Sequence, residues 1–110
     1  MSEPLASVET EQVNGQTVVR LIGEIDLSNI QQLQRQLLRF VESSQAVVVD
    51  LTGIEYLDSQ GLRMIKQLRD VADGRGNPFA VVAPSGTFVR QVLEMSHLDE
   101  YVQIRDAVEG

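Results

Sequence analysis

The sequence predicts an α/β fold in which a mostly parallel sheet opens with an antiparallel hairpin and is covered by helices, in the order β-β-α-β-α-β-α-β. Three observations predict this class. Two strand-like runs flank the dipeptide Asn14-Gly15, an amphipathic helical pattern follows them, and short apolar runs then alternate with two further helical patterns. The length of 110 residues suits one small domain, which we expect to span 1–110.

The opening hairpin is predicted from residues 8–13 and 17–22, which carry valine, threonine and isoleucine. The Asn-Gly pair between them favours a two-residue turn, because both residues accept positive φ. Ser28 precedes Gln31 by three positions, and this capping-box signature marks the start of the first helix. Apolar side chains then recur at helical spacing as far as Val41.

A valine-rich run at 46–51 predicts a strand that is buried on both faces. A connector at 52–57 then leads to the second helix. That helix is predicted to begin near Ser59 and to end before Gly74 and Gly76, since glycine commonly follows the last helical turn.

The last part of the chain continues the alternation. Residues 79–83 predict another buried strand, which Pro84 ends. Ser85 is placed to cap a third helix with Phe88 on its inner face, and residues 101–104 predict a last short strand.

Composition narrows the function classes. The formal net charge is -7 with a single lysine, whereas binding of DNA or RNA needs clustered cations. The absence of cysteine excludes disulfides, thiolate nucleophiles and cysteine-based zinc sites. No run approaches the roughly 20 apolar residues of a membrane span, and the N-terminus lacks a signal pattern. We therefore expect a cytoplasmic protein with no membrane insertion and no direct nucleic-acid contact.

Enzymatic chemistry finds little support in the residues. His97 is the only histidine and has no second metal ligand or thiol to pair with, so it is interpreted as a helix-end or packing residue. Gly74-Arg75-Gly76 follows a helix, whereas a phosphate-binding loop precedes one. We therefore predict no catalytic residues, no metal and no cofactor.

Four acids, Glu24, Asp26, Asp50 and Asp58, fall at or near predicted strand ends, where parallel sheets bind ligands. They leave open a magnesium site like that of a receiver domain, with Asp50 as the phosphorylated residue. However, the late lysine and the adjacent acidic pair of a receiver are absent. Asp58 is equally interpreted as a helix cap.

Three motifs resemble one known family. Val47 to Leu51 followed by Tyr56-Leu57-Asp58-Ser59-Gln60-Gly61-Leu62 resembles the Asp-Ser-x-Gly-Leu signature of anti-sigma factor antagonists, which are STAS domains (sulphate transporter and anti-sigma factor antagonist). Gly23-Glu24-Ile25-Asp26 and Met95-Ser96-His97-Leu98-Asp99 match further family elements in the right order. The resemblance covers nearly the whole chain and implies a single STAS-like domain.

The resemblance also implies a mechanism. In that family the serine of the signature is phosphorylated by a partner, a serine kinase that is also the anti-sigma factor. The unphosphorylated antagonist binds this partner and frees a sigma factor; a serine phosphatase restores the binding form. Carried over, Ser59 is the phosphorylation site, and Asp26, Asp58, Gln60, Gly61 and Arg63 join it on the partner-binding surface.

Two residues depart from the family pattern. Gln60 and Arg63 stand where small residues are common in the family. These departures leave a second interpretation open, a non-switching STAS subunit of a lipid or anion transport complex. Arg63 also lies four residues after Ser59, so it can pair with a phosphate there, or else face solvent or a partner.

Overall fold

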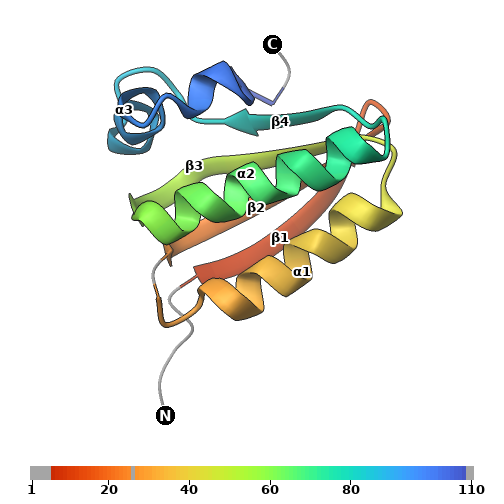
Figure 1. The fold of residues 1–110 in the computed structure, drawn as a ribbon, viewed down its shortest axis with the longest axis horizontal. Helices are drawn as coiled ribbons and strands as arrows, with labels where there is room; N and C mark the ends of the chain where they lie inside the picture. Colours follow the sequence, from red (N-terminus) through yellow and green to blue (C-terminus); the bar gives the residue numbers. More distant parts are fainter. Residues whose placement is uncertain (1–5, 26, 109–110) are drawn as a thin grey trace.

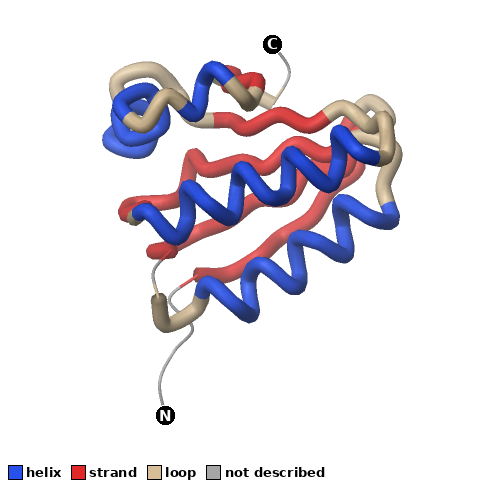
Figure 2. The backbone as a smooth tube through the Cα atoms, in the orientation of Figure 1, coloured by secondary structure: helices blue, strands red, loops and turns tan. Residues whose placement is uncertain are grey.

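The computed structural model describes residues 6–25 and 27–108, and its chain path is shown in Figures 1 and 2. The predicted order of strands and helices is confirmed. The elements are β1 (Ala6–Val13), β2 (Gln16–Ile25), α1 (Ile30–Ser43), β3 (Val47–Leu57), α2 (Ser59–Gly74), β4 (Phe79–Val82), α3 (Phe88–Met95), the 3-10 turn η1 (Leu98–Glu100) and β5 (Gln103–Arg105).

The five strands lie in the sheet in the order β1-β2-β3-β4-β5. Strands β1 and β2 pair antiparallel, as predicted, and Asn14 and Gly15 between them have φ values of 50° and 79°. The remaining pairs are parallel. Because crossovers between parallel strands are almost always right-handed, this sequential order places the connecting helices on one face. Figure 1 shows α1 and α2 side by side in front of the sheet.

The main core lies between the sheet and its helices. It joins Leu21 of β2 to Leu37, Ile65 and Leu93 of the three helices, all with 1% or less of their surface exposed. A smaller cluster occupies the other face of the sheet and consists of Val18, Val48, Ala80 and Val82. Strand β3 is therefore buried on both faces along its first residues, as the valine run predicts.

Strand β3 is longer than predicted. The expected connector at 52–57 is wrong, because the strand continues through it to Leu57. Two bulges explain the misleading pattern: Arg20 to Ile22 of β2 opposes Asp50 to Gly53 of β3, and a second shift follows Gly23. Each bulge adds one residue to β3, so exposed residues come in pairs and the two-residue alternation of a strand is lost.

The ends of other elements also differ from prediction. Strand β1 begins at Ala6, β2 continues to Ile25 and β4 ends at Val82. Asn29, and not Ser28, is the cap of α1, and its side-chain amide donates to the carbonyl of Glu24 at 2.7 Å. Thr87, and not Ser85, caps α3, because the amide and hydroxyl of Ser85 both donate to Asp106.

Phe88, predicted to face inward, is the first residue of α3 and is 54% exposed. The last strand covers residues 103–105 in place of the predicted 101–104. No helix within 6–25 and 27–108 combines the length and the apolar character that crossing a bilayer requires.

Candidate functional site

The passage from β3 into α2 presents Ser59 to solvent. Leu57 ends the strand as a buried residue, and Asp58 follows as the cap of the helix. One carboxylate oxygen of Asp58, Oδ1, accepts hydrogen bonds from the backbone amides of Gln60 at 2.9 Å and Gly61 at 3.2 Å. Ser59 is the first helical residue and is exposed. The prediction that Asp58 caps this helix is confirmed.

Gly61 brings the first turn of α2 close to the sheet. It is buried, and a Cβ added to it would lie 2.1 Å from Cδ1 of Leu57 and 3.3 Å from Cγ2 of Ile25. No other residue type fits without moving these side chains. Gly61 therefore lets the first turn of α2, which carries Ser59, pack closely against the sheet.

The exposed face of α2 continues from Ser59 through two cations. Arg63 lies one turn further on and is exposed, and no ion pair joins it to another residue of the described chain. Lys66 follows, and its Nζ lies 5.1 Å from the centre of the Tyr101 ring. Met64, on the opposite side of the helix, is buried. The structure thus brings Asp58, Ser59, Gln60 and Arg63 together on one helical start.

The second family motif lies on the neighbouring strand at the same edge of the sheet. Ile25 pairs with Leu57, and Glu24 pairs with Tyr56. Gly23 has a φ of 116°, which side chains rarely adopt, and it sits at one of the bulges between β2 and β3. Asp26, predicted to lie on the same surface, falls outside the described residues.

Sequence reasoning did not find two exposed apolar side chains at this edge. Leu27 follows β2 and is 73% exposed, and Tyr56 at the end of β3 is 45% exposed. Tyr56 lies inside the predicted connector, where the strand pattern that would have placed its side chain was not recognised. Leu27 carries no sequence signal that indicates exposure.

Asp50 does not lie at a strand end, and this prediction is wrong. It is the fourth residue of β3 and is only 8% exposed. Its Oδ1 accepts from the amide and hydroxyl of Thr52 at 2.9 and 2.6 Å, and its Oδ2 lies 3.5 Å from Nε of Arg20. Both oxygens have partners, so the geometric basis for a phosphorylated aspartate is missing.

His97 lies at the surface between α3 and η1. Its φ is 63°, its side chain is 75% exposed, and its Nδ1 lies 3.3 Å from Oε2 of Glu100. This agrees with the helix-end interpretation. Within the described chain, no three acidic or histidine side chains gather closely enough to hold a metal ion.

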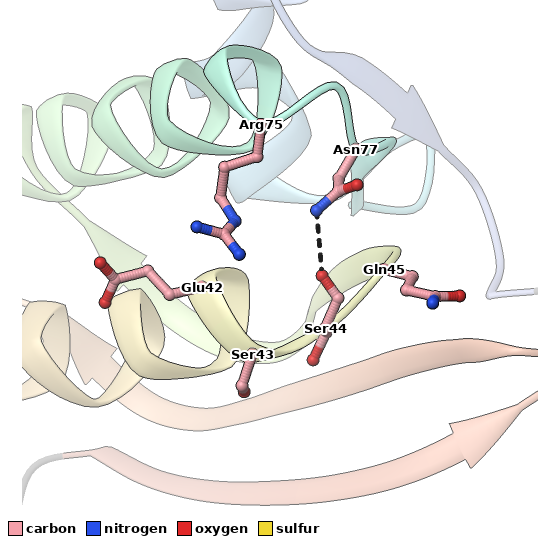
Figure 3. A pocket seen from close by; sticks show the side chains of 6 residues that line it. All are labelled: Glu42, Ser43, Ser44, Gln45, Arg75 and Asn77. Carbon is pink, nitrogen blue, oxygen red and sulfur yellow. Dashed lines mark hydrogen bonds between the residues drawn. The ribbon is translucent and has the colours of Figure 1, made fainter.

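Three hollows lined by described residues lie at the opposite end of the sheet from Ser59. One is lined by Glu42, Ser43, Ser44, Gln45, Arg75 and Asn77. Figure 3 shows Arg75, from the end of α2, facing the end of α1 across it, and Asn77 donating to the carbonyl of Ser44 at 3.2 Å. Two further hollows open at the same end, beside Gly15 and Pro78.

Known proteins resemble this chain in both sequence and fold. The STAS domain model matches residues 7–110. The anti-sigma-F factor antagonist RsfB of Mycobacterium tuberculosis is 30% identical over 102 residues, which cover 88% of this chain and 82% of that protein.

Solved structures give the same result. An anti-sigma factor antagonist from Mycobacterium paratuberculosis has a TM-score of 0.86 at 27% identity, and the match covers 99% of this chain and 93% of that one. The Bacillus cell fate determinant SpoIIAA, solved in a phosphorylated form, shares the fold with a TM-score of 0.68 at 19% identity, over 94% of this chain and 93% of that one. This chain therefore belongs to the STAS domain family and, within it, to the anti-sigma factor antagonists.

Proposed function

We propose that this protein is a partner-switching antagonist whose unphosphorylated form binds a serine-kinase anti-sigma factor and so releases a sigma factor. Phosphorylation of Ser59 ends that binding, and a serine phosphatase restores it. The protein works in the cytoplasm as one domain spanning 1–110. Members of its family are regulatory binding proteins and not enzymes, so the chemistry belongs to the partners.

One observation carries the proposal: Ser59 is exposed as the first residue of α2, immediately after its cap Asp58. A kinase can therefore reach the hydroxyl without unfolding the helix. In the transfer, a bond forms between Ser59 Oγ and the γ-phosphorus of ATP while the bond to the β-γ bridging oxygen breaks. ADP leaves, and the hydroxyl proton passes to a base of the kinase.

The added charge explains how binding ends. A phosphoserine carries about -1.5 to -2 charge at neutral pH. On the free surface, water solvates this charge, but inside a packed interface it is desolvated beside the carboxylate of Asp58. The phosphate therefore destabilises the complex more than the domain, and the switch acts on the contact with little change in fold.

The test incubates the purified protein with its cognate anti-sigma kinase and ATP and locates the phosphate by mass spectrometry. We expect one phosphate, on Ser59. In pull-downs, Ser59→Ala should retain the kinase and Ser59→Asp should lose it, while both variants melt cooperatively. Gln45→Asp is the matched control, because it adds the same charge to an exposed residue at the far end of the sheet and should keep the partner.

Three outcomes would contradict the proposal. Phosphate on another residue would move the switch elsewhere, and a collapsed melting curve for Ser59→Asp would show that the switch acts through unfolding. Capture of transport subunits in place of a kinase would favour the non-switching STAS subunit, with which Gln60 and Arg63 are compatible.

A further inference from the structure

Three of the backbone amides at the start of α2, those of Gln60, Gly61 and Leu62, already donate hydrogen bonds. A helix N-terminus attracts anions through its unpaired amides. Here the amides of Gln60 and Gly61 both donate to Oδ1 of Asp58, and the amide of Leu62 donates to the Asp58 carbonyl at 3.1 Å. A phosphate on Ser59 would have to displace a carboxylate of its own sign to reach them. A cationic side chain is therefore better placed than these three amides to stabilise the phosphate.

Arg63 is the cation in the right place. A helix rises about 1.5 Å per residue, so Arg63 lies about 6 Å along the axis from Ser59 and on the same face. It is exposed and has no ion pair within the described chain. Lys66 lies about 10.5 Å along the axis, and its ammonium group is held over the Tyr101 ring. Arginine also suits the task, because its planar fork can hold two phosphate oxygens.

We infer that Arg63 holds the phosphoryl group of phosphorylated Ser59 within the same chain, in place of the helix amides that Asp58 occupies. This inference rests on the proposed phosphorylation of Ser59 and adds the residue that regulates it. Arg63 partly neutralises the charge that separates the protein from its kinase. The side chain thereby lowers the contrast between the two states of the switch.

The test measures the phosphate itself and does not need the kinase. Phosphoserine is installed at position 59 during translation, and its second pKa is followed by phosphorus NMR. Arg63→Gln should raise this pKa by about 0.2–0.7 unit, the range expected for an exposed ion pair. Arg63→Lys should restore part of the difference. Raising the salt from about 0.05 to about 0.5 M should shrink it, because the screening length falls.

Lys66→Gln is the matched control, since it removes one positive charge from the next turn of the same helix. It should change the phosphate pKa by less than half as much as Arg63→Gln. Equal pKa values in the parent and Arg63→Gln proteins would overturn the inference. Equal pKa shifts from both variants would also overturn it, because they would show a general electrostatic effect of positive charge on the helix and no specific pair between Arg63 and the phosphate.

A second readout separates this inference from the proposed function. Arg63→Gln should lower the melting temperature of the phosphorylated form more than that of the unphosphorylated form, and it should widen the difference between the two in kinase binding. A kinase that never modifies Ser59 would refute the proposed switch and leave the phosphoserine titration intact. A normal switch with no effect of Arg63 would refute the inference alone.

Discussion

At the scale of single residues, the start of α2 depends on the carboxylate of Asp58, which accepts hydrogen bonds from the first helical turn, and on the lack of a side chain at Gly61. Asp58 supplies an acceptor for two amides, and Gly61 leaves space for Leu57 and Ile25 against the helix backbone. The exposed position of Ser59 follows from both, since the helix must begin at once and begin close to the sheet.

Gly61→Ala should destabilise the domain by about 1–3 kcal/mol, although alanine is the better helix former, because the new methyl group overlaps Leu57. Gly74→Ala is the matched control at the other end of the same helix, where nothing lies within 4 Å of an added Cβ. It should be neutral or stabilising by up to about 1 kcal/mol. Urea denaturation gives the free energy of unfolding of both variants. Equal stabilities would contradict the prediction, because they would mean that the Leu57 side chain moves aside at no cost.

At the scale of elements, a carboxylate joins the loop before α3 to the segment after β5. Asp106 accepts from the hydroxyl and amide of Ser85, and its Oδ1 lies 3.3 Å from Nη1 of Arg90. The hydrogen bonds from Ser85, with the charge of Arg90, lower the pKa of Asp106 below its ordinary value. The C-terminal strand is thereby tied to a loop 21 residues away in sequence.

This pKa shift predicts a pH dependence. Because the pKa of Asp106 is lower in the folded than in the unfolded protein, the carboxylate favours folding above its unfolded pKa of about 3.9. That contribution is lost as the pH falls through the folded-state pKa. The melting temperature of Asp106→Asn should therefore be lower than that of the parent near pH 7 and should approach it in acid.

Asp99→Asn serves as the control for the pH series, since it also removes an exposed carboxylate from this end of the chain. If the melting difference for Asp106→Asn stayed constant from neutral pH into acid, the link between Ser85 and Asp106 would not contribute to stability in solution.

At the scale of the whole molecule, the sheet is a layer with apolar side chains packed on both faces. Val48 belongs to the smaller cluster behind the sheet and is 2% exposed, whereas its neighbours Val47 and Val49 belong to the main core. The first five residues of β3 are thus buried on both faces of the sheet, although helices cover only one face.

Val48→Asp should prevent folding, because it buries a charge for which the cluster offers no partner. Tyr56→Asp places the same charge on an exposed residue of the same strand and should leave a cooperative transition. Circular dichroism and thermal melting of the two variants separate these results. Soluble, cooperative folding of Val48→Asp would mean that water reaches the back of the sheet.

Much of the architecture could be predicted because its signals are local. Asn14 and Gly15 are residue types that readily adopt the positive φ values of a two-residue turn. Valine runs and helical spacing indicate the alternation of strands and helices. Bulges in β3 could not be predicted, since they arise from its pairing with β2 and disturb the spacing that identifies a strand.

The candidate site also combines features set by neighbouring residues, which could be predicted, with features set by distant residues, which could not. The capping role of Asp58 is local and was predicted, whereas the cap of α3 moved to Thr87 because Ser85 bonds Asp106. The exposure of Tyr56 likewise depends on the bulged register with Glu24, a neighbour far away in sequence.

Strands that are neighbours in this sheet are also neighbours along the chain, from β1 to β5. Each pairing therefore closes one hairpin turn or one helical crossover, and the entropy lost in closing such short loops is small. Every new strand can add to an edge that the preceding strand has already formed. The topology thus permits assembly during synthesis, from the first hairpin onward, with the folding rate expected of a mixed α/β domain.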